Sequence, residues 1–294
     1  MRIYIFLILK LLIFIPSLLY SDSLKINGTN NSNTNFTPTA EMLKKDWSSS
    51  IEMERSWKSA LVRIPVSVGK SIASTVDEME KKLSEKVKKF PTVIFLHGCY
   101  GVHPGTYHRI KFLADHGFLT IAPVSFARLK YPKSCDIYTY QSGLYRGTIK
   151  IREFDAKYAI TKLKKLNFVD TENIILMGHS EGGITTAVLK LNEETQKLKA
   201  RIIEGWNCTP DAWPEYTGIN ASKHEMILSL VGLNDPWFSY SDYKKGCGPL
   251  LNKKNGSIGI VYKSERLQYE HSLLDYKKVK QDVLKFLNKV TSRP

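Results

Sequence analysis

The segment Ile174-Ile175-Leu176-Met177-Gly178-His179-Ser180-Glu181-Gly182-Gly183 joins a short apolar run to the pattern G-x-S-x-G. Its four apolar residues suit a strand buried on both faces, and residues 183–190 suit a helix. The turn between them must be very tight, and the glycines at positions 178 and 182 remove Cβ atoms that would collide there. The segment therefore predicts Ser180 as a nucleophile exposed above the edge of a sheet.

Glu181 follows the predicted nucleophile and opens the predicted helix. Its backbone N–H carries the positive end of the helix dipole, so it is expected to form one half of an oxyanion hole. Its carboxylate has two interpretations, contact with substrate or support of the helix start. The bare pattern G-x-S-x-G also occurs by chance in loops rich in Gly and Ser. Its position between a strand and a helix favours the catalytic interpretation.

A second buried run, residues 91–96, changes abruptly into the loop His97-Gly98-Cys99-Tyr100-Gly101. In enzymes with a nucleophile on such a turn, a loop after an earlier strand supplies the other oxyanion N–H. We expect the backbone of Cys99 to supply it here, which leaves the Cys99 side chain available for a disulfide. His97 is expected to hold the loop and not to transfer protons.

Two further residues complete a candidate triad. Asp235 lies just past the predicted strand 225–232, and His271 lies in the loop after the predicted strand 257–262. Together with Ser180 they follow the chain order nucleophile, acid, base that is typical of α/β-hydrolases. A serine hydroxyl is a poor nucleophile until imidazole accepts its proton, and the carboxylate orients the imidazole.

Both triad partners also have plainer interpretations. Asp235 precedes a proline and is compatible with a simple turn former, with Asp211 and Asp242 as weaker substitutes for the acid. His271 is compatible with a surface histidine. The other six histidines lie inside the two motifs or beside elements that do not suit a base, so His271 is the better candidate.

Length and composition favour one catalytic domain. The chain has 294 residues and is 43% hydrophobic, which is enough for one sizeable core. Its 43 Lys and Arg residues against 28 Asp and Glu give a net charge of +15, which would attract anionic partners. The lysines are scattered through many segments and accompany no nucleic-acid motif. We therefore expect solvated faces and no nucleic-acid partner.

The first residues indicate export. Met1-Arg2 precedes an apolar stretch, residues 3–20, which is interrupted by Lys10 and Pro16 and is typical of a secretory signal peptide ending at Ser21. An uncleaved anchor is the alternative; otherwise no stable membrane insertion is expected after cleavage. Residues 22–58 are predicted as a flexible leader, because residues 23–39 are rich in Asn, Ser and Thr. The catalytic domain is expected over residues 59–294, in a periplasmic or secreted protein.

The chain has four cysteines, which are Cys99, Cys135, Cys208 and Cys247. An oxidising compartment would allow two disulfides, and the sequence alone permits three pairings. No C-x-x-C spacing occurs, which weakens both the zinc and the thioredoxin-like interpretations. We expect no metal and no organic cofactor.

Strand and helix patterns alternate along the rest of the chain. Strands are predicted at 59–68, 91–96, 118–123, 174–177, 200–206, 225–232 and 257–262, and helices at 107–116, 144–166, 183–190 and 274–290. The charged residues 77–89 suit a surface helix or a loop. Arg152 and Asp155 lie three residues apart on one predicted helix and are expected to form a helix-surface or helix-to-loop ion pair.

From Pro91 to its end, the sequence resembles the dienelactone hydrolase family of α/β-hydrolases, particularly its exported members. The matching positions are Leu96 to Gly101, Ser125-Phe126, Arg128, Cys135, Arg152, Asp155, Val169-Asp170, Gly178 to Gly183, Gly232, Asp235 and His271. The resemblance implies the α/β-hydrolase fold, a mostly parallel central sheet with helices on both faces. It also implies the disulfides Cys99–Cys135 and Cys208–Cys247. The enzymes that gave the family its name have a cysteine nucleophile where this chain has Ser180, so their particular substrate is not inferred.

These observations predict an exported serine hydrolase that cleaves a small carboxylic ester or lactone through an acyl-enzyme. Ser180, Asp235 and His271 form its expected triad, and the pocket candidates are Tyr100, Trp237 and Phe238, for which core packing is the alternative. Two other functions are also considered: a peptidase-like hydrolase of the same fold, and a catalytically silent domain that binds a partner through its basic surface.

Overall fold

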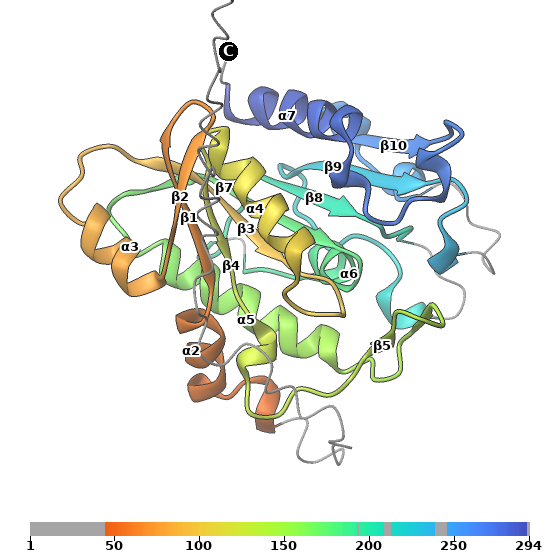
Figure 1. Ribbon diagram of the computed structural model, residues 1–294, viewed down its shortest axis with the longest axis horizontal. Coiled ribbons are helices and arrows are strands. Elements are labelled where there is room, and N and C mark those ends of the chain that lie inside the picture. Colours follow the sequence, from red (N-terminus) through yellow and green to blue (C-terminus); the bar gives the residue numbers. More distant parts are fainter. Residues whose placement is uncertain (1–44, 193, 209–212, 239–245, 293–294) are drawn as a thin grey trace, which may run out of the picture.

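The computed structural model describes residues 45–192, 194–208, 213–238 and 246–292, and its centre is an eight-stranded sheet (Figure 1). The strand order is β10-β9-β8-β7-β3-β4-β1-β2. The strands are β1 (Leu61–Ser67), β2 (Lys70–Ser74), β3 (Phe90–Leu96), β4 (Leu119–Ala122), β7 (Val169–His179), β8 (Ala200–Glu204), β9 (Met226–Gly232) and β10 (Ile258–Tyr262). A separate two-stranded hairpin consists of β5 (Cys135–Asp136) and β6 (Gln141–Ser142).

Strands β3, β4 and β7 to β10 run parallel, whereas β1 is antiparallel to both of its neighbours, β2 and β4. From β3 the chain moves to β4 on one side and later to β7 on the other. The crevice between β3 and β7 is therefore the switch point of the sheet, where open parallel sheets bind ligands at the carboxyl ends of their strands. The loop that begins at His97 and the turn at Ser180 both follow these two strands.

Helices cover both faces of the sheet (Figure 1). They are α2 (Ser50–Lys58), α3 (Val76–Leu83), α4 (Pro104–Asp115), α5 (Thr148–Leu163), α6 (Glu181–Val188) and α7 (Lys277–Thr291). Helices α4 and α7 share a core with side chains such as Val93, Met177 and Ile202. Helices α2, α3 and α5 pack on the opposite face against side chains such as Ile94 and Leu176.

The buried apolar runs explain the central strands. All seven residues of β3 are buried, and β7 is buried from Ile174 to His179. A strand covered by helices on both faces is apolar at successive positions and not at alternate ones. The predicted strands and helices are present with small shifts of their ends, and the predicted α/β-hydrolase fold with its mostly parallel sheet is confirmed.

Two parts of the structure differ from the sequence prediction. Helix α2 lies inside residues 22–58, and its Trp57 is only 1% exposed. The prediction of a flexible leader up to residue 58 is therefore wrong for the residues of α2, because the buried side chains of this helix belong to the core. The strand β2 was not expected, since its alternating exposed positions at the sheet edge carry little apolar signal.

The predicted signal peptide, residues 1–21, lies outside the described residues. Within the described part of the chain, no helix is long and apolar enough to cross a membrane.

Candidate active site

Ser180 occupies the sharp turn between β7 and α6, with φ 56° and ψ −121°. A non-glycine residue rarely adopts a positive φ, and such strain is typical of functional sites. The two flanking glycines make the turn feasible. A Cβ atom on Gly178 would lie 2.0 Å from the carbonyl oxygen of Gly182, and one on Gly182 would lie 2.1 Å from that of Leu96. The backbone N–H of Ser180 donates to the Glu204 carbonyl at 2.9 Å, which ties the turn to the end of β8.

His271 and Asp235 meet although they are 36 residues apart in the chain. The His271 Nδ1 lies 2.7 Å from the Asp235 Oδ2. Because a carboxylate only accepts, Nδ1 carries the proton and donates a hydrogen bond to the carboxylate. Asp235 is 1% exposed, and its other oxygen accepts the backbone N–H of Trp237 at 3.0 Å. Within the described residues, the buried Nε2 of His271 has no hydrogen-bond partner. This nitrogen is therefore available to accept a proton or a hydrogen bond.

One pocket brings Ser180 and His271 together. Its lining also includes Cys99, Ser134, Ser142, Gly143, Glu181, Ile184, Gly205, Trp206, Trp213, Trp237 and Phe238. The imidazole ring is packed on three sides, with ring centroids 5.1 Å from His179, 5.4 Å from Trp237 and 6.0 Å from Phe238. These contacts restrict the orientations that the His271 ring can adopt.

The predicted pocket residues are only partly brought together. Trp237 and Phe238 line the pocket, whereas Tyr100 is 56% exposed and does not belong to its lining. Trp213, in the segment after Cys208, also lines the pocket. The weaker acid candidates Asp211 and Asp242 lie outside the described residues.

Glu181 does not present its carboxylate to the pocket as a free group. The carboxylate accepts the hydroxyl of Ser134 at 2.9 Å and the hydroxyl of Thr148, and it forms an ion pair with Arg152 at 3.2 Å. The Glu181 side chain is only 9% exposed. Of the two interpretations offered by the sequence, the observed contacts favour support of the helix start over contact with substrate.

Two histidines of the motifs are buried and held neutral. Burial keeps the pKa of His97 well below its ordinary value, and the positive charge of Arg152 lowers it further. The His97 Nδ1 donates to the Gly98 carbonyl at 2.9 Å, so His97 holds the loop, in line with the role expected from the sequence. Burial likewise keeps the pKa of His179 well below its ordinary value, and the positive charge of Arg109 adds to the effect.

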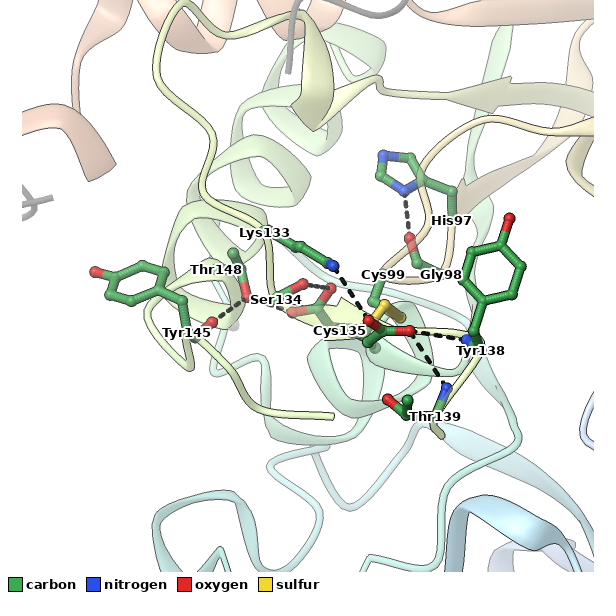
Figure 2. The surroundings of a disulfide bond; sticks show 12 residues. His97, Gly98, Cys99, Lys133, Ser134, Cys135, Tyr138, Thr139, Tyr145 and Thr148 are labelled. Atoms are coloured by element: carbon green, nitrogen blue, oxygen red, sulfur yellow. Dashed lines mark hydrogen bonds and ion pairs between the residues drawn. A yellow bond between two sulfur atoms is a disulfide. The ribbon is translucent and has the colours of Figure 1, made fainter. Parts of the chain in front are cut away.

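Two disulfides lie close to the pocket, and the first involves the lining residue Cys99. Cys99 is bonded to Cys135, and Cys208 is bonded to Cys247, which are the pairings that the family resemblance implies. Figure 2 shows the first bond between the loop after β3 and the hairpin of β5, with Ser134 next to Cys135. The second bond lies behind the wall of the pocket, where the sulfur of Cys247 lies 3.4 Å from the carbonyl oxygen of Trp206.

Arg152 and Asp155 each form a buried ion pair, but not with each other: that of Asp155 joins a helix to a loop, and that of Arg152 joins α5 to the first residue of α6. Asp155 accepts three hydrogen bonds from Arg128, the shortest at 2.7 Å, and both side chains are 1% exposed. Arg152 instead contacts Glu181 and the loop at His97. The sequence missed these partners because they lie on other elements. It also missed Ser134, Gly205 and Trp206 as site residues. Gly205 and Trp206 directly follow β8, and this position at the carboxyl end of a parallel strand could have indicated them.

Comparison with known proteins places the chain near several hydrolases. The chlorophyllase family model matches residues 66–206, just under half of the chain. A protein described as a dienelactone hydrolase from Klebsiella pneumoniae is 14% identical with a TM-score of 0.48, covering 80% of this chain and 99% of that chain. Esterase 2 of Thermogutta terrifontis with bound propionate is 15% identical with a TM-score of 0.47, covering 79% and 89%. No curated protein matches the chain by sequence.

The fold assignment rests on the strand order and the mostly parallel sheet described above. Across the described residues, no group of three or more His, Cys, Asp or Glu side chains is placed to hold a metal ion.

Proposed function

We propose that this protein is a serine hydrolase that cleaves a small, uncharged carboxylic ester or lactone. One observation carries the proposal: the strained Ser180 shares a pocket with an imidazole whose Nδ1 is held by a buried carboxylate and whose Nε2 is free. These are the parts that an activated serine nucleophile requires. Asp235 and His271 are the proposed acid and base.

In the proposed reaction, the Ser180 hydroxyl attacks the carbonyl carbon of the ester while the His271 Nε2 accepts its proton. Asp235 stabilises the imidazolium that forms, because it already accepts the proton on Nδ1 at 2.7 Å. The tetrahedral intermediate collapses, and the alcohol leaves with the proton from Nε2. Water then attacks the acyl-enzyme with His271 again as base, which releases the acid and restores Ser180.

The negative oxygen of the intermediate would be held by the backbone N–H groups of Cys99 and Glu181. The N–H of Glu181 is the first of α6 and has no partner within the helix. Removing one donor of such a pair typically reduces kcat by about 10²- to 10³-fold. The Glu181 carboxylate supports this arrangement through its contacts with Ser134, Thr148 and Arg152.

The pocket favours a short, uncharged acyl group. Its walls are the bulky apolar side chains of Ile184, Trp206, Trp213 and Phe238, which leave little room for a long chain. Among its described lining residues, the only carboxylate is that of Glu181, which is already bonded to three neighbours. A charged acyl group would lose its hydration without gaining a partner, which is costly.

Export is part of the proposal. Two disulfides within one chain are typical of oxidising compartments, and the apolar residues 3–20 are typical of a signal peptide. Mass spectrometry of the protein purified from its own cell envelope and medium tests both points. Cleavage after Ser21 and two intact disulfides are expected; a reduced protein that retains residues 1–21 in the cytoplasm would contradict export.

The reaction is tested with a fluorophosphonate probe, which labels activated serines. We compare the native protein with Ser180→Ala, His271→Ala and Asp235→Asn, each checked for folding by circular dichroism. Ser142→Ala is the matched control, because Ser142 lines the same pocket. Labelling should be lost without Ser180, fall sharply without His271 and persist in the Ser142 variant. A folded native protein that is not labelled would contradict the proposal and favour a silent binding domain.

Substrate class is tested with p-nitrophenyl esters of increasing acyl length, a small lactone and a peptide. We expect kcat/KM to be highest for short acyl esters, to fall for longer acyl chains as the pocket fills, and to be negligible for the peptide. Turnover of the peptide at a rate similar to the best ester would favour the peptidase-like alternative.

A further inference from the structure

The peptide unit that joins Gly98 to Cys99 links the proposed oxyanion hole to the interior of the protein. A trans peptide is planar, and its C=O and N–H groups point in opposite directions. Whatever fixes the Gly98 carbonyl therefore also fixes the direction of the Cys99 N–H. The loop also lies close to the nucleophile, since a Cβ atom on Gly98 would be 3.5 Å from the Cβ of Ser180.

A buried guanidinium is one of the donors that hold this peptide unit, and the only one from a distant element among those of the described residues. Arg152, on α5, is 1% exposed and donates from Nη2 to the Gly98 carbonyl at 2.9 Å and from Nη1 to the His97 carbonyl at 2.5 Å. The His97 Nδ1 donates to the same Gly98 carbonyl at 2.9 Å, as drawn in Figure 2. The backbone N–H of Gly101 also donates to it, at 3.1 Å. Three donors on one carbonyl oxygen leave the peptide little freedom to rotate.

The same guanidinium reaches the other half of the proposed hole. Its Nη2 lies 3.2 Å from the Glu181 Oε2, and Glu181 carries the second N–H donor. Its Nε donates to the Tyr131 hydroxyl at 2.7 Å, and burial raises the pKa of Tyr131, so this partner is a neutral phenol. Arginine presents its N–H groups in a rigid planar fork, whereas lysine has one flexible ammonium group that cannot reproduce this set of contacts.

We propose that Arg152 is a positioning residue that aligns both oxyanion donors, Cys99 N–H and Glu181 N–H, without touching the substrate. The inference rests on the proposed hydrolase function. It predicts that changes at Arg152 weaken stabilisation of the intermediate and leave binding of the intact ester nearly unchanged, because only the intermediate carries the negative oxygen.

The test replaces Arg152 by lysine, which keeps the charge and removes the fork. The readouts are kcat, KM and the inhibition constants of two ligands: a trifluoromethyl ketone, whose adduct with serine places an oxyanion in the hole, and the uncharged alcohol product. We expect kcat to fall about 10- to 100-fold and affinity for the ketone to fall by a similar factor. KM and affinity for the alcohol should change less than about threefold.

Arg201→Lys is the matched control. Arg201 is fully buried, pairs with Glu225 and donates to the carbonyls of Thr186 and Leu189, so it resembles Arg152 in burial and bonding but does not contact the loop at His97. Its variant should lose stability and keep kcat per folded molecule. Equal losses of kcat in both variants would mean that Arg152 has only a structural role and would overturn the inference.

A second variant keeps the test decisive if Arg152→Lys does not fold. In the double variant Arg152→Gln/Glu181→Gln both charges of the buried pair are removed, so neither is left without a partner. The same loss of kcat and ketone affinity is expected, with Glu181→Gln alone as reference. Unchanged kinetics relative to that reference would overturn the inference. If the native enzyme hydrolyses no ester at all, the proposed function itself fails, which is a distinguishable result.

Discussion

Replacing Ser180 by glycine should stabilise the folded protein relative to replacing it by alanine. Ser180 adopts φ 56° and ψ −121°, and its side chain makes no capping hydrogen bond at the start of α6. Alanine keeps the Cβ atom and therefore the strain, whereas glycine removes both. Backbone strain in sparsely populated conformations costs about 1–3 kcal/mol for a non-glycine residue. The comparison of the two variants isolates this strain, because both lack the hydroxyl.

Glycine also lowers stability through the greater freedom of the unfolded chain, by about 0.5–1 kcal/mol relative to alanine. The expected net gain of Ser180→Gly over Ser180→Ala is therefore about 0–2.5 kcal/mol, the difference between these two ranges. For a domain of this size, each kcal/mol raises Tm by about 2–4 °C. The assay is urea unfolding followed by circular dichroism, with both disulfides intact and with the midpoint and slope fitted separately.

Ser272 provides the matched control. It also precedes a short helix and makes no capping hydrogen bond, but its φ is −91°. There the glycine variant should be less stable than the alanine variant. The sign of the difference should thus reverse between the two positions. A glycine variant at 180 that is no more stable than the alanine variant, relative to this control, would refute the claim that the turn stores strain.

Three further predictions concern other parts of the site. Burial keeps the pKa values of His97 and His179 well below 6.5 in the folded state, so only the unfolded chain binds these two protons as the pH falls. Below about pH 6.5 the free energy of unfolding should therefore decrease by about 1.4 kcal/mol per pH unit for each histidine. In urea titrations at several pH values, His179→Gln should remove about half of this combined dependence. A pH dependence that is the same in the variant as in the native protein would contradict the prediction. Replacing Cys99 and Cys135 by alanine should lower the free energy of unfolding by about 2–4 kcal/mol and should also lower kcat. Replacing Cys208 and Cys247 by alanine should lower the free energy of unfolding by a similar amount but should act mainly on KM. Identical kinetic effects of the two changes would argue against a link between Cys99 and the oxyanion hole. Trp213→Ala should widen the pocket and shift the preferred p-nitrophenyl ester to longer acyl chains, and an unchanged chain-length profile would show that Trp213 does not limit the acyl group.

The sequence by itself determined the elements whose signals are local. The apolar runs of β3 and β7 are visible because both faces of these strands are covered, so that no polar position interrupts them. The turn at Ser180 is visible in the sequence because positions 178 and 182 require glycine: a Cβ atom at either position would collide with the backbone. The chain order of Ser180, Asp235 and His271 was also sufficient to propose a triad before their positions were described.

Only the tertiary structure decided which distant groups meet. The 2.7 Å contact of His271 with Asp235, the pairing of Asp155 with Arg128 and the contacts of Arg152 with Gly98 and Glu181 join different elements. A buried arginine must find acceptors wherever the fold supplies them, and its neighbours along the helix do not reveal which carbonyls or carboxylates those will be. The pocket walls Trp206 and Trp213 come together for the same reason: strand order and burial bring them there, and spacing along the chain does not.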